Sequence, residues 1–177
     1  MNTASSNHNL LNGELTYDGD FARLFYQRRL PYPRERVWAA LTDPEQVKKW
    51  LMATSVAIDG RPGGSLDTVA GPSQIRATGK ILTWDPPRAY EYEWVVEPRE
   101  ELPKGENSFV RWELADVGGE TVLTLEHRRL TRATGSGFAA GWHAFLDRLA
   151  ALVDGRPLPD WIKRFTELQR DYPGWEK

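Results

Sequence analysis

The chain has 177 residues, with 23 basic and 25 acidic side chains and a formal net charge of −2. This length suits one domain with a substantial core, and the charge balance argues against binding to nucleic acid or to a membrane surface. The chain contains no cysteine, which excludes a disulfide framework, a thiolate metal site and a cysteine nucleophile. It has eight tryptophans, more than the packing of one such domain requires.

The first twelve residues are rich in Asn and Ser, and we expect residues 1–12 to form a mobile tail. They lack the hydrophobic core of a signal peptide. No stretch of the chain approaches the roughly 20 apolar residues that a membrane helix needs. We therefore expect a cytoplasmic protein that does not insert into membranes.

Strand patterns begin directly after the tail. Residues 13–17 offer a short strand before the turn signal Asp18-Gly19, and residues 21–30 alternate as a longer strand. A first short helix is expected over residues 34–41. A second begins at Asp43, a capping residue followed by proline at the first helical position, and extends to about residue 51.

Six further strand-like segments follow, separated by turn signals rich in Gly and Pro, so the sheet should be antiparallel. In the clearest of them the apolar residues alternate with Glu91 and Glu93, which should therefore face solvent. The predicted strands cover residues 54–58, 65–70, 74–84, 90–96, 109–115 and 121–130.

A long amphipathic helix is predicted from Gly137 to Val153, after the last strand. Its apolar residues recur every three or four positions and so share one stripe. A break at residues 155–159 precedes another short helix over residues 160–170. We divide the chain into a domain over residues 13–155 and a helical appendage over residues 156–177. The stripe of the long helix comprises Phe138, Trp142, Phe145, Leu149 and Leu152.

This order predicts an α+β fold in which a curved sheet grips one helix and leaves a cavity beside it. Several short sequence motifs occur along the chain in the order that this fold would require. The ordered set resembles the START-like helix-grip superfamily, also called SRPBCC, in the branch similar to the activator of heat shock protein 90 ATPase. The matching residues are Pro33, Val37, Trp38, Leu41 to Pro44 and Trp50, then Gly63-Gly64, Gly79, Asp85 to Pro87, Gly118 to Thr121 with Leu123, Leu125 and His127, and Gly141-Trp142 with Leu146-Asp147 and Leu149.

The resemblance implies a seven-stranded antiparallel sheet around the long C-terminal helix, with two short helices after the first strand. Members of the superfamily bind lipids, hormones or polyketide intermediates in the cavity, and a minority are enzymes. One branch includes a co-chaperone. We expect no cofactor.

Aromatic residues on the strand faces and on the long helix are the candidate walls of a ligand site. Such walls, with few polar groups, are typical of small-molecule pockets, although each ring on its own is equally explained by core packing. Trp50 should lie near the cavity mouth if the family geometry holds. The wall candidates are Tyr92, Trp94, Trp112, Phe138, Trp142 and Phe145.

His127 is the candidate polar contact, because it shares its strand parity with Leu123 and Leu125 and should face inward. The alternative is a buried histidine satisfied by its neighbours. His143 should lie at the edge of the long helix. Arg28 interrupts an apolar strand face, and either closes an internal ion pair or clamps a ligand carboxylate. The three dispersed histidines do not form a metal site, and we identify no catalytic motif.

Three functions remain open. The first is non-enzymatic binding of a small hydrophobic molecule. The second is a cyclase-like or aromatase-like enzyme that uses the same cavity with His127 or Arg28 as acid, base or oxyanion partner. The third is a stress-related co-chaperone of a heat shock protein 90 type ATPase, for which Trp161 and Phe165 would provide an exposed apolar patch. A homodimer is compatible with each.

Overall fold

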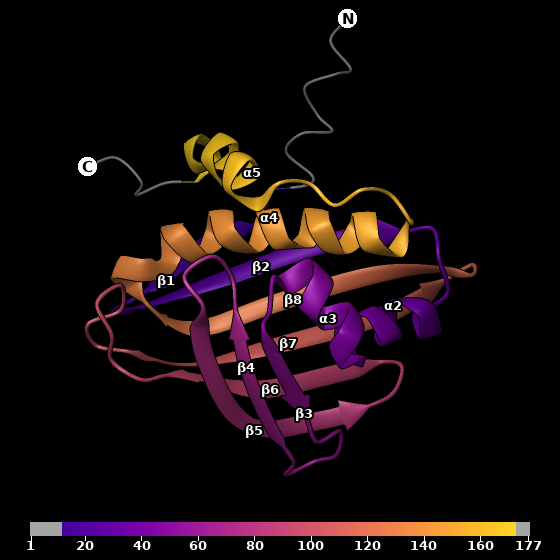
Figure 1. The fold of residues 1–177 in the computed structure, drawn as a ribbon, viewed down its shortest axis with the longest axis horizontal. Helices are drawn as coiled ribbons and strands as arrows, with labels where there is room; N and C mark the ends of the chain where they lie inside the picture. Colours follow the sequence, from indigo (N-terminus) through magenta and orange to yellow (C-terminus); the bar gives the residue numbers. More distant parts are fainter. Residues whose placement is uncertain (1–11, 173–177) are drawn as a thin grey trace, which may run out of the picture.

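One antiparallel sheet curves around a long helix in the computed structural model, which describes residues 12–172 (Figure 1). The predicted α+β helix-grip arrangement agrees with this architecture. The predicted mobile tail over residues 1–12 falls outside the described residues except for Asn12. The strands are β1 (Glu14–Asp18), β2 (Phe21–Leu30), β3 (Ser55–Ile58), β4 (Ser65–Ala70), β5 (Ile75–Asp85), β6 (Ala89–Val96), β7 (Glu106–Val117) and β8 (Glu120–Thr131).

The sheet has eight strands in the order β1-β2-β8-β7-β6-β5-β4-β3. The predicted number of seven was wrong because it left out the short first segment, which pairs with β2 as an edge strand. The turn between them places Gly19 at φ 56°, a conformation that glycine adopts without a steric penalty. The predicted Asp18-Gly19 hairpin is therefore confirmed, and it adds the extra strand.

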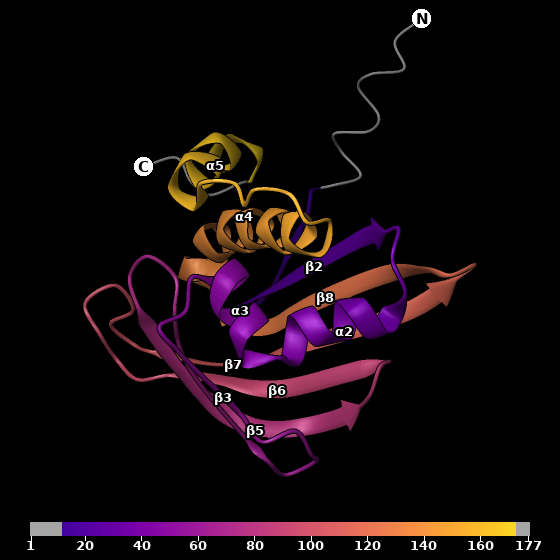
Figure 2. The ribbon, with the colours of Figure 1, turned by 45° about the vertical axis from the view of Figure 1, so that its right-hand side comes forward.

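Two short helices carry the chain from β2 across to the opposite edge of the sheet, as predicted (Figure 2). They are α2 (Arg34–Thr42) and α3 (Pro44–Leu51). The Asp43 carboxylate accepts a hydrogen bond from the backbone N–H of Glu45 at 3.0 Å, which caps α3 as the sequence indicated. Both helices lie beside one end of the long helix and close that end of the sheet.

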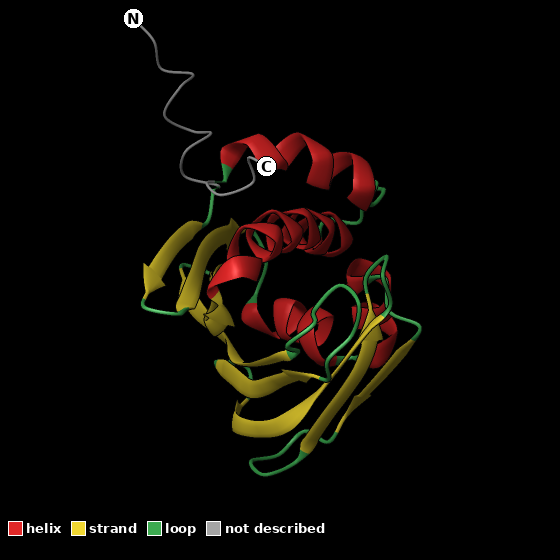
Figure 3. Ribbon diagram, turned by 90° about the vertical axis from the view of Figure 1, so that its left-hand side faces the viewer, coloured by secondary structure: helices red, strands yellow, loops and turns green. Residues whose placement is uncertain are grey.

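The long helix α4 (Gly135–Val153) lies across the concave face of the sheet. It begins two residues before the predicted start, because the short 3-10 turn η1 (Arg132–Thr134) leads directly into it. The appendage forms α5 (Trp161–Leu168) and the 3-10 turn η2 (Gln169–Asp171). Viewed along α4, the sheet lies on one side of this helix and α5 lies on the other (Figure 3). The side chains between the layers form one main core cluster.

Candidate functional site

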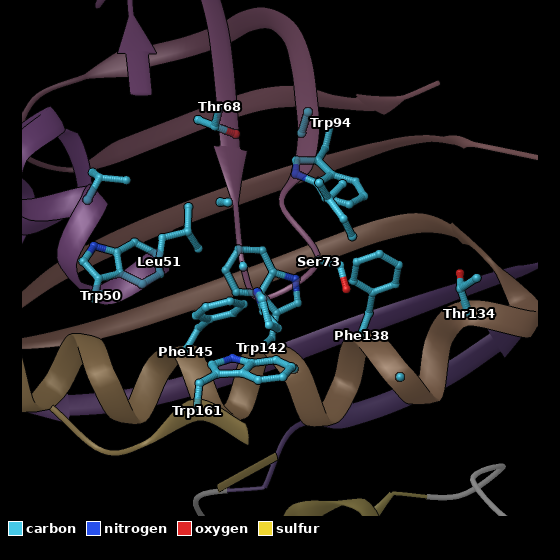
Figure 4. A pocket seen from close by; sticks show the side chains of 18 of the residues that line it. Trp50, Leu51, Thr68, Ser73, Trp94, Thr134, Phe138, Trp142, Phe145 and Trp161 are labelled. Atoms are coloured by element: carbon cyan, nitrogen blue, oxygen red, sulfur yellow. The ribbon is translucent and has the colours of Figure 1, made fainter. Parts of the chain in front are cut away.

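A cavity of about 620 Å³ lies between the concave face of the sheet and helices α3, α4 and α5 (Figure 4). This volume falls within the range of small-molecule binding sites. Seven of the eight predicted site residues line it. They come from two strands, β6 and β7, and two helices, α3 and α4, which are far apart in the sequence. They are Trp50, Tyr92, Trp94, Trp112, Phe138, Trp142 and Phe145.

Small residues on the cavity walls explain why the space persists. Strands β4 and β5 present Thr68, Ala70 and Ala77 to it, opposite the large rings of β6 and β7. Gly137 and Gly141 of α4 also line the cavity and carry no side chain there. Leu66 of β4 and Ile75 of β5 also line the cavity. Since close packing normally fills a protein interior, the small residues among these larger ones leave part of the space between sheet and helix unfilled.

The aromatic walls brace one another by edge-to-face contacts. The rings of Trp112 and Trp142 have centroids 5.6 Å apart and an interplanar angle of 81°, and Trp94 and Phe138 are 5.2 Å apart at 87°. Edge-to-face pairs of this kind add to the stabilisation from buried area. The rings are therefore held in position, and the cavity they enclose is formed before any ligand arrives.

Trp50 lies in the buried wall and not at the cavity mouth where it was expected. Its indole N–H donates to the carbonyl of Ala40 at 2.8 Å, and its ring meets Trp112 edge to face at 6.0 Å. The hydrogen bond joins the end of α3 to α2. Trp50 thus fixes the position of the two short helices and provides part of the inner wall at the same time.

His127 does not line the cavity, in contrast to the prediction that it contacts a ligand. Its side chain is fully buried behind Trp94, Phe138 and Trp142. The Trp142 indole N–H donates to His127 Nδ1 at 2.9 Å, and the Ser108 hydroxyl oxygen lies 2.8 Å from Nε2. Both ring nitrogens are therefore occupied, which corresponds to the alternative of a histidine satisfied by its neighbours.

The directions of these hydrogen bonds follow from their donors. An indole N–H can only donate, so Nδ1 of His127 accepts and Nε2 carries the proton. Nε2–H then donates to the Ser108 oxygen, and the Ser108 hydroxyl donates to the Trp94 carbonyl at 3.1 Å. This polarity is opposite to that of a serine–histidine catalytic pair, in which the histidine accepts the serine proton. Burial also lowers the pKa of His127 to about 3, so the ring is neutral at physiological pH.

Helix α5 supplies two cavity residues that the sequence had suggested for a different role. Trp161 and Phe165 stack with ring centroids 4.7 Å apart, and Trp161 lies 5.2 Å from Phe145. Both line the cavity, so the exposed patch expected of them was wrong. The signal was present in the sequence, because these two residues share one face of the predicted helix. What the sequence did not indicate is the surface that this face covers.

The remaining polar candidates lie on the far side of α4, away from the cavity lining. Arg28 is 6% exposed and does not line the cavity. No carboxylate of the described chain lies within salt-bridge distance of it, although the charge of Asp147 opposes the lowering of its pKa by burial. His143 is also buried, and not at the helix edge as predicted. Its Nδ1 lies 2.7 Å from the Tyr172 hydroxyl, which ties the end of the appendage to α4.

The carboxylates of Glu91 and Glu93 lie on the strand face opposite the rings, as their parity predicted. They are half-buried and not freely solvated. Glu91 pairs with Arg111 at 3.4 Å and with Arg128 at 3.2 Å across the convex face of the sheet. Glu91 therefore belongs to an outer surface network, and neither carboxylate lines the cavity.

Within residues 12–172, no group of three or more His, Cys, Asp or Glu side chains is placed to hold a metal ion. No helix among these residues is long and apolar enough to cross a membrane.

Residues 31–154 match the family described as Activator of Hsp90 ATPase homolog 1-like protein. The chain belongs to this family. The matched region contains α2 to α4 and most of the cavity wall, whereas α5 lies beyond it. The resemblance seen in the sequence is thus confirmed. A search of curated proteins found no match.

Solved structures support the same fold over nearly the whole chain. A protein of *Bordetella parapertussis* encoded by gene BPP1335 is 28% identical with a TM-score of 0.68, covering 92% of this chain and 90% of that one. CalU16 from *Micromonospora echinospora* is 24% identical with a TM-score of 0.68 over 93% and 94% of the two chains. A conserved protein of unknown function from *Enterococcus faecalis*, EF2215, is 14% identical with a TM-score of 0.68 over 97% and 96%.

Proposed function

We propose that this member of the family binds a small hydrophobic molecule in the cavity and does not transform it. The observation that carries the proposal is the cavity of about 620 Å³ with ten aromatic side chains in its lining. Burial of apolar ligand surface against such walls provides the driving force for binding. The family to which the chain belongs has the same helix-grip architecture, which supports this use of the space between sheet and helix.

The site favours binding over a cyclase-like reaction. General acid–base catalysis needs a titratable group within hydrogen-bond reach of the substrate. His127 is separated from the cavity by rings and donates to Ser108, and Arg28 lies on the other side of α4. Either residue would have to leave a buried position to reach a ligand.

The co-chaperone function has less support from the structure. The family description refers to an activator of Hsp90 ATPase, but the residues expected to form an apolar docking patch face the cavity instead. Addition of the chain to an Hsp90-type ATPase would test this role directly. A stimulated ATPase rate that survives filling of the cavity would favour the co-chaperone over the ligand binder.

The binding proposal is tested by titration with N-phenyl-1-naphthylamine, an uncharged probe that fluoresces in apolar surroundings. Ala77 lines the cavity, and Ala57 lies exposed on β3. We expect saturable binding to the native chain and to A57L, and at least tenfold weaker binding to A77L, because the added side chain occupies cavity volume. No saturable binding to the native chain, or equal binding to both variants, would contradict the proposal.

A further inference from the structure

The cavity lining contains no positive charge among the described residues. Its one charged side chain is Glu101, which is 48% exposed at the rim and pairs with Arg99 at 2.6 Å. Neither Arg28 nor His127 reaches the lining. A carboxylate or phosphate carried into this cavity would lose its hydration without gaining a counter-charge, which is strongly unfavourable. An uncharged ligand avoids this cost.

The hydroxyl group of Thr68 lacks a hydrogen-bond partner on the described part of the cavity wall. Thr68 lines the cavity from β4, is 6% exposed, and forms no hydrogen bond with any described residue. Its cross-strand partner on β5 is Ala77, which offers no side-chain polar group. Figure 4 shows the Thr68 side chain on the sheet side of the cavity, with its oxygen turned toward the side where Trp94 lies. A buried hydroxyl normally forms at least one hydrogen bond.

The other hydroxyl groups on the inner walls are less available. The Tyr92 hydroxyl accepts a hydrogen bond from the Trp112 indole N–H at 3.4 Å. The Tyr90 hydroxyl has no partner, but it is fully enclosed in a side-chain cluster in which the Tyr90 ring lies 5.0 Å from that of Trp84. Of these three hydroxyl groups, that of Thr68 alone is neither hydrogen-bonded within the described chain nor fully enclosed.

We propose that the cavity selects uncharged aromatic molecules with a carbonyl oxygen, which accepts a hydrogen bond from the Thr68 hydroxyl, over their carboxylate analogues. This inference rests on the proposed binding function and adds a chemical class to it. The aromatic part is bound by the rings, the carbonyl satisfies the unpartnered hydroxyl, and the uncharged wall disfavours the anion.

Three ligands of one size separate these contributions. They are 2-acetylnaphthalene, an uncharged ketone; 2-ethylnaphthalene, its hydrocarbon analogue; and 2-naphthoate, an anion at pH 7.5. Affinities are measured directly by calorimetry and by displacement of N-phenyl-1-naphthylamine. We expect the ketone to bind about three- to tenfold more tightly than the hydrocarbon, the difference that one hydrogen bond provides. The naphthoate should bind at least tenfold more weakly than the ketone.

The variant Thr68→Val keeps the side-chain shape and removes the hydroxyl. It should bring the ketone affinity to that of the hydrocarbon and leave the hydrocarbon affinity unchanged. Thr78→Val is the matched control, because Thr78 lies on β5 outside the cavity lining. It should leave all three affinities unchanged.

The inference is overturned if naphthoate binds as tightly as the ketone, or if T68V retains the preference for the ketone. In both cases the hydrocarbon still binds, so the proposed binding function survives. Failure of all three ligands and of the fluorescent probe to bind would overturn the binding function itself, and the selectivity with it.

Discussion

At the scale of single residues, the histidine on β8 shows how a polar group can be structural at a position that looks functional. His127 has the inward parity that the sequence predicted, yet Trp142 and Ser108 occupy both of its nitrogens. These hydrogen bonds fix Trp142, whose ring forms part of the cavity wall. The residue therefore acts on the cavity through the position of its neighbour.

The buried neutral state of His127 predicts a pH-dependent stability. Its pKa in the folded chain is about 3, whereas an unfolded histidine has a pKa of about 6.5. As the pH falls below 6.5, the unfolded chain takes up a proton that the folded chain does not, so stability falls. Between pH 7 and pH 5 this single group should remove about 2 kcal/mol from the free energy of unfolding.

Urea denaturation of the native chain and of H127Q at several pH values measures this effect. The glutamine cannot titrate, so its unfolding free energy should depend less on pH by about the same 2 kcal/mol. The comparison cancels the contribution of every other titrating group. Parallel pH profiles for the two proteins would show that His127 has the same pKa in the folded and the unfolded chain.

The buried guanidinium of Arg28 is a second residue whose cost can be measured. Burial lowers the pKa of Arg28, and the nearby Asp147 carboxylate opposes that shift. One terminal nitrogen has no hydrogen-bond partner, and the other donates to the carbonyl of Gln27 at 3.1 Å. Since a poorly paired buried charge costs more than it returns, we expect R28M to be as stable as the native chain or more stable by about 1–2 kcal/mol.

The control for this prediction is R29M on the same strand. Arg29 is 65% exposed in a surface pair with Glu120, and its replacement should change the unfolding free energy by less than about 0.5 kcal/mol. Denaturation in guanidinium chloride measures both variants. A loss of 3 kcal/mol or more in R28M would indicate that the arginine is satisfied by a partner and stabilises the fold.

At the scale of secondary-structure elements, α5 is the part whose role changed most from the sequence to the structure. Its amphipathic pattern predicted a helix, and residues 161–168 form one. Arg148 of α4 links this region to α3, because it donates to the carbonyls of Lys49, Trp50 and Pro159. The appendage is thereby held where its aromatic face completes the cavity.

Removal of one ring of α5 should therefore affect both binding and stability. We expect W161A to bind N-phenyl-1-naphthylamine at least fivefold more weakly and to lose about 2–4 kcal/mol of stability, because Trp161 packs on Phe145 and Phe165. Fluorescence titration and urea denaturation provide the two readouts. I162A is the control from the same helix, since Ile162 is 60% exposed and should affect neither quantity. If W161A and I162A had the same probe affinity and the same stability, α5 would not be part of the binding site.

At the scale of the whole molecule, the cavity presents apolar side chains that a bound ligand would bury. Empty apolar volume costs stability because the lining atoms lack contact partners on one side. Two kinds of contact offset this loss of stability. They are the contacts between the aromatic rings and the hydrogen bonds that hold α3 and α5 against α4. Such a molecule should respond to a ligand with a large gain in stability.

A ligand at 100 times its dissociation constant should stabilise the folded chain by about 2.7 kcal/mol. For a chain of this length, that gain corresponds to an increase in melting temperature of about 5–11 °C. Differential scanning calorimetry with and without 2-acetylnaphthalene measures it. The A77L variant, which should bind at least tenfold more weakly, should gain no more than about 1.4 kcal/mol at the same ligand concentration, so its melting temperature should rise by about half as much or less. A ligand that binds but leaves the melting temperature of the native chain unchanged would have to bind the unfolded chain equally well.

Local patterns in the sequence were sufficient for the elements and for most of the cavity residues. Alternation placed Tyr92, Trp94 and Trp112 on one strand face, and helical spacing placed Phe138 and Trp142 on one stripe. These predictions succeeded because side-chain direction in a strand or helix depends only on position along the element. Seven of the eight residues line the cavity, but Trp50 lies in its inner wall and not at its mouth, and His127 lies behind the rings.

Tertiary structure decided the rest, because it depends on which elements meet. Ser108 and Trp142 are 19 and 15 residues from His127, and only the paired strands and the docked helix bring them within hydrogen-bond distance. The same holds for α5, whose aromatic face was evident from the sequence but whose place over the cavity was not. The sequence by itself thus determined the fold, the family and the ring-lined walls, whereas contacts between distant segments decided which polar groups reach the cavity.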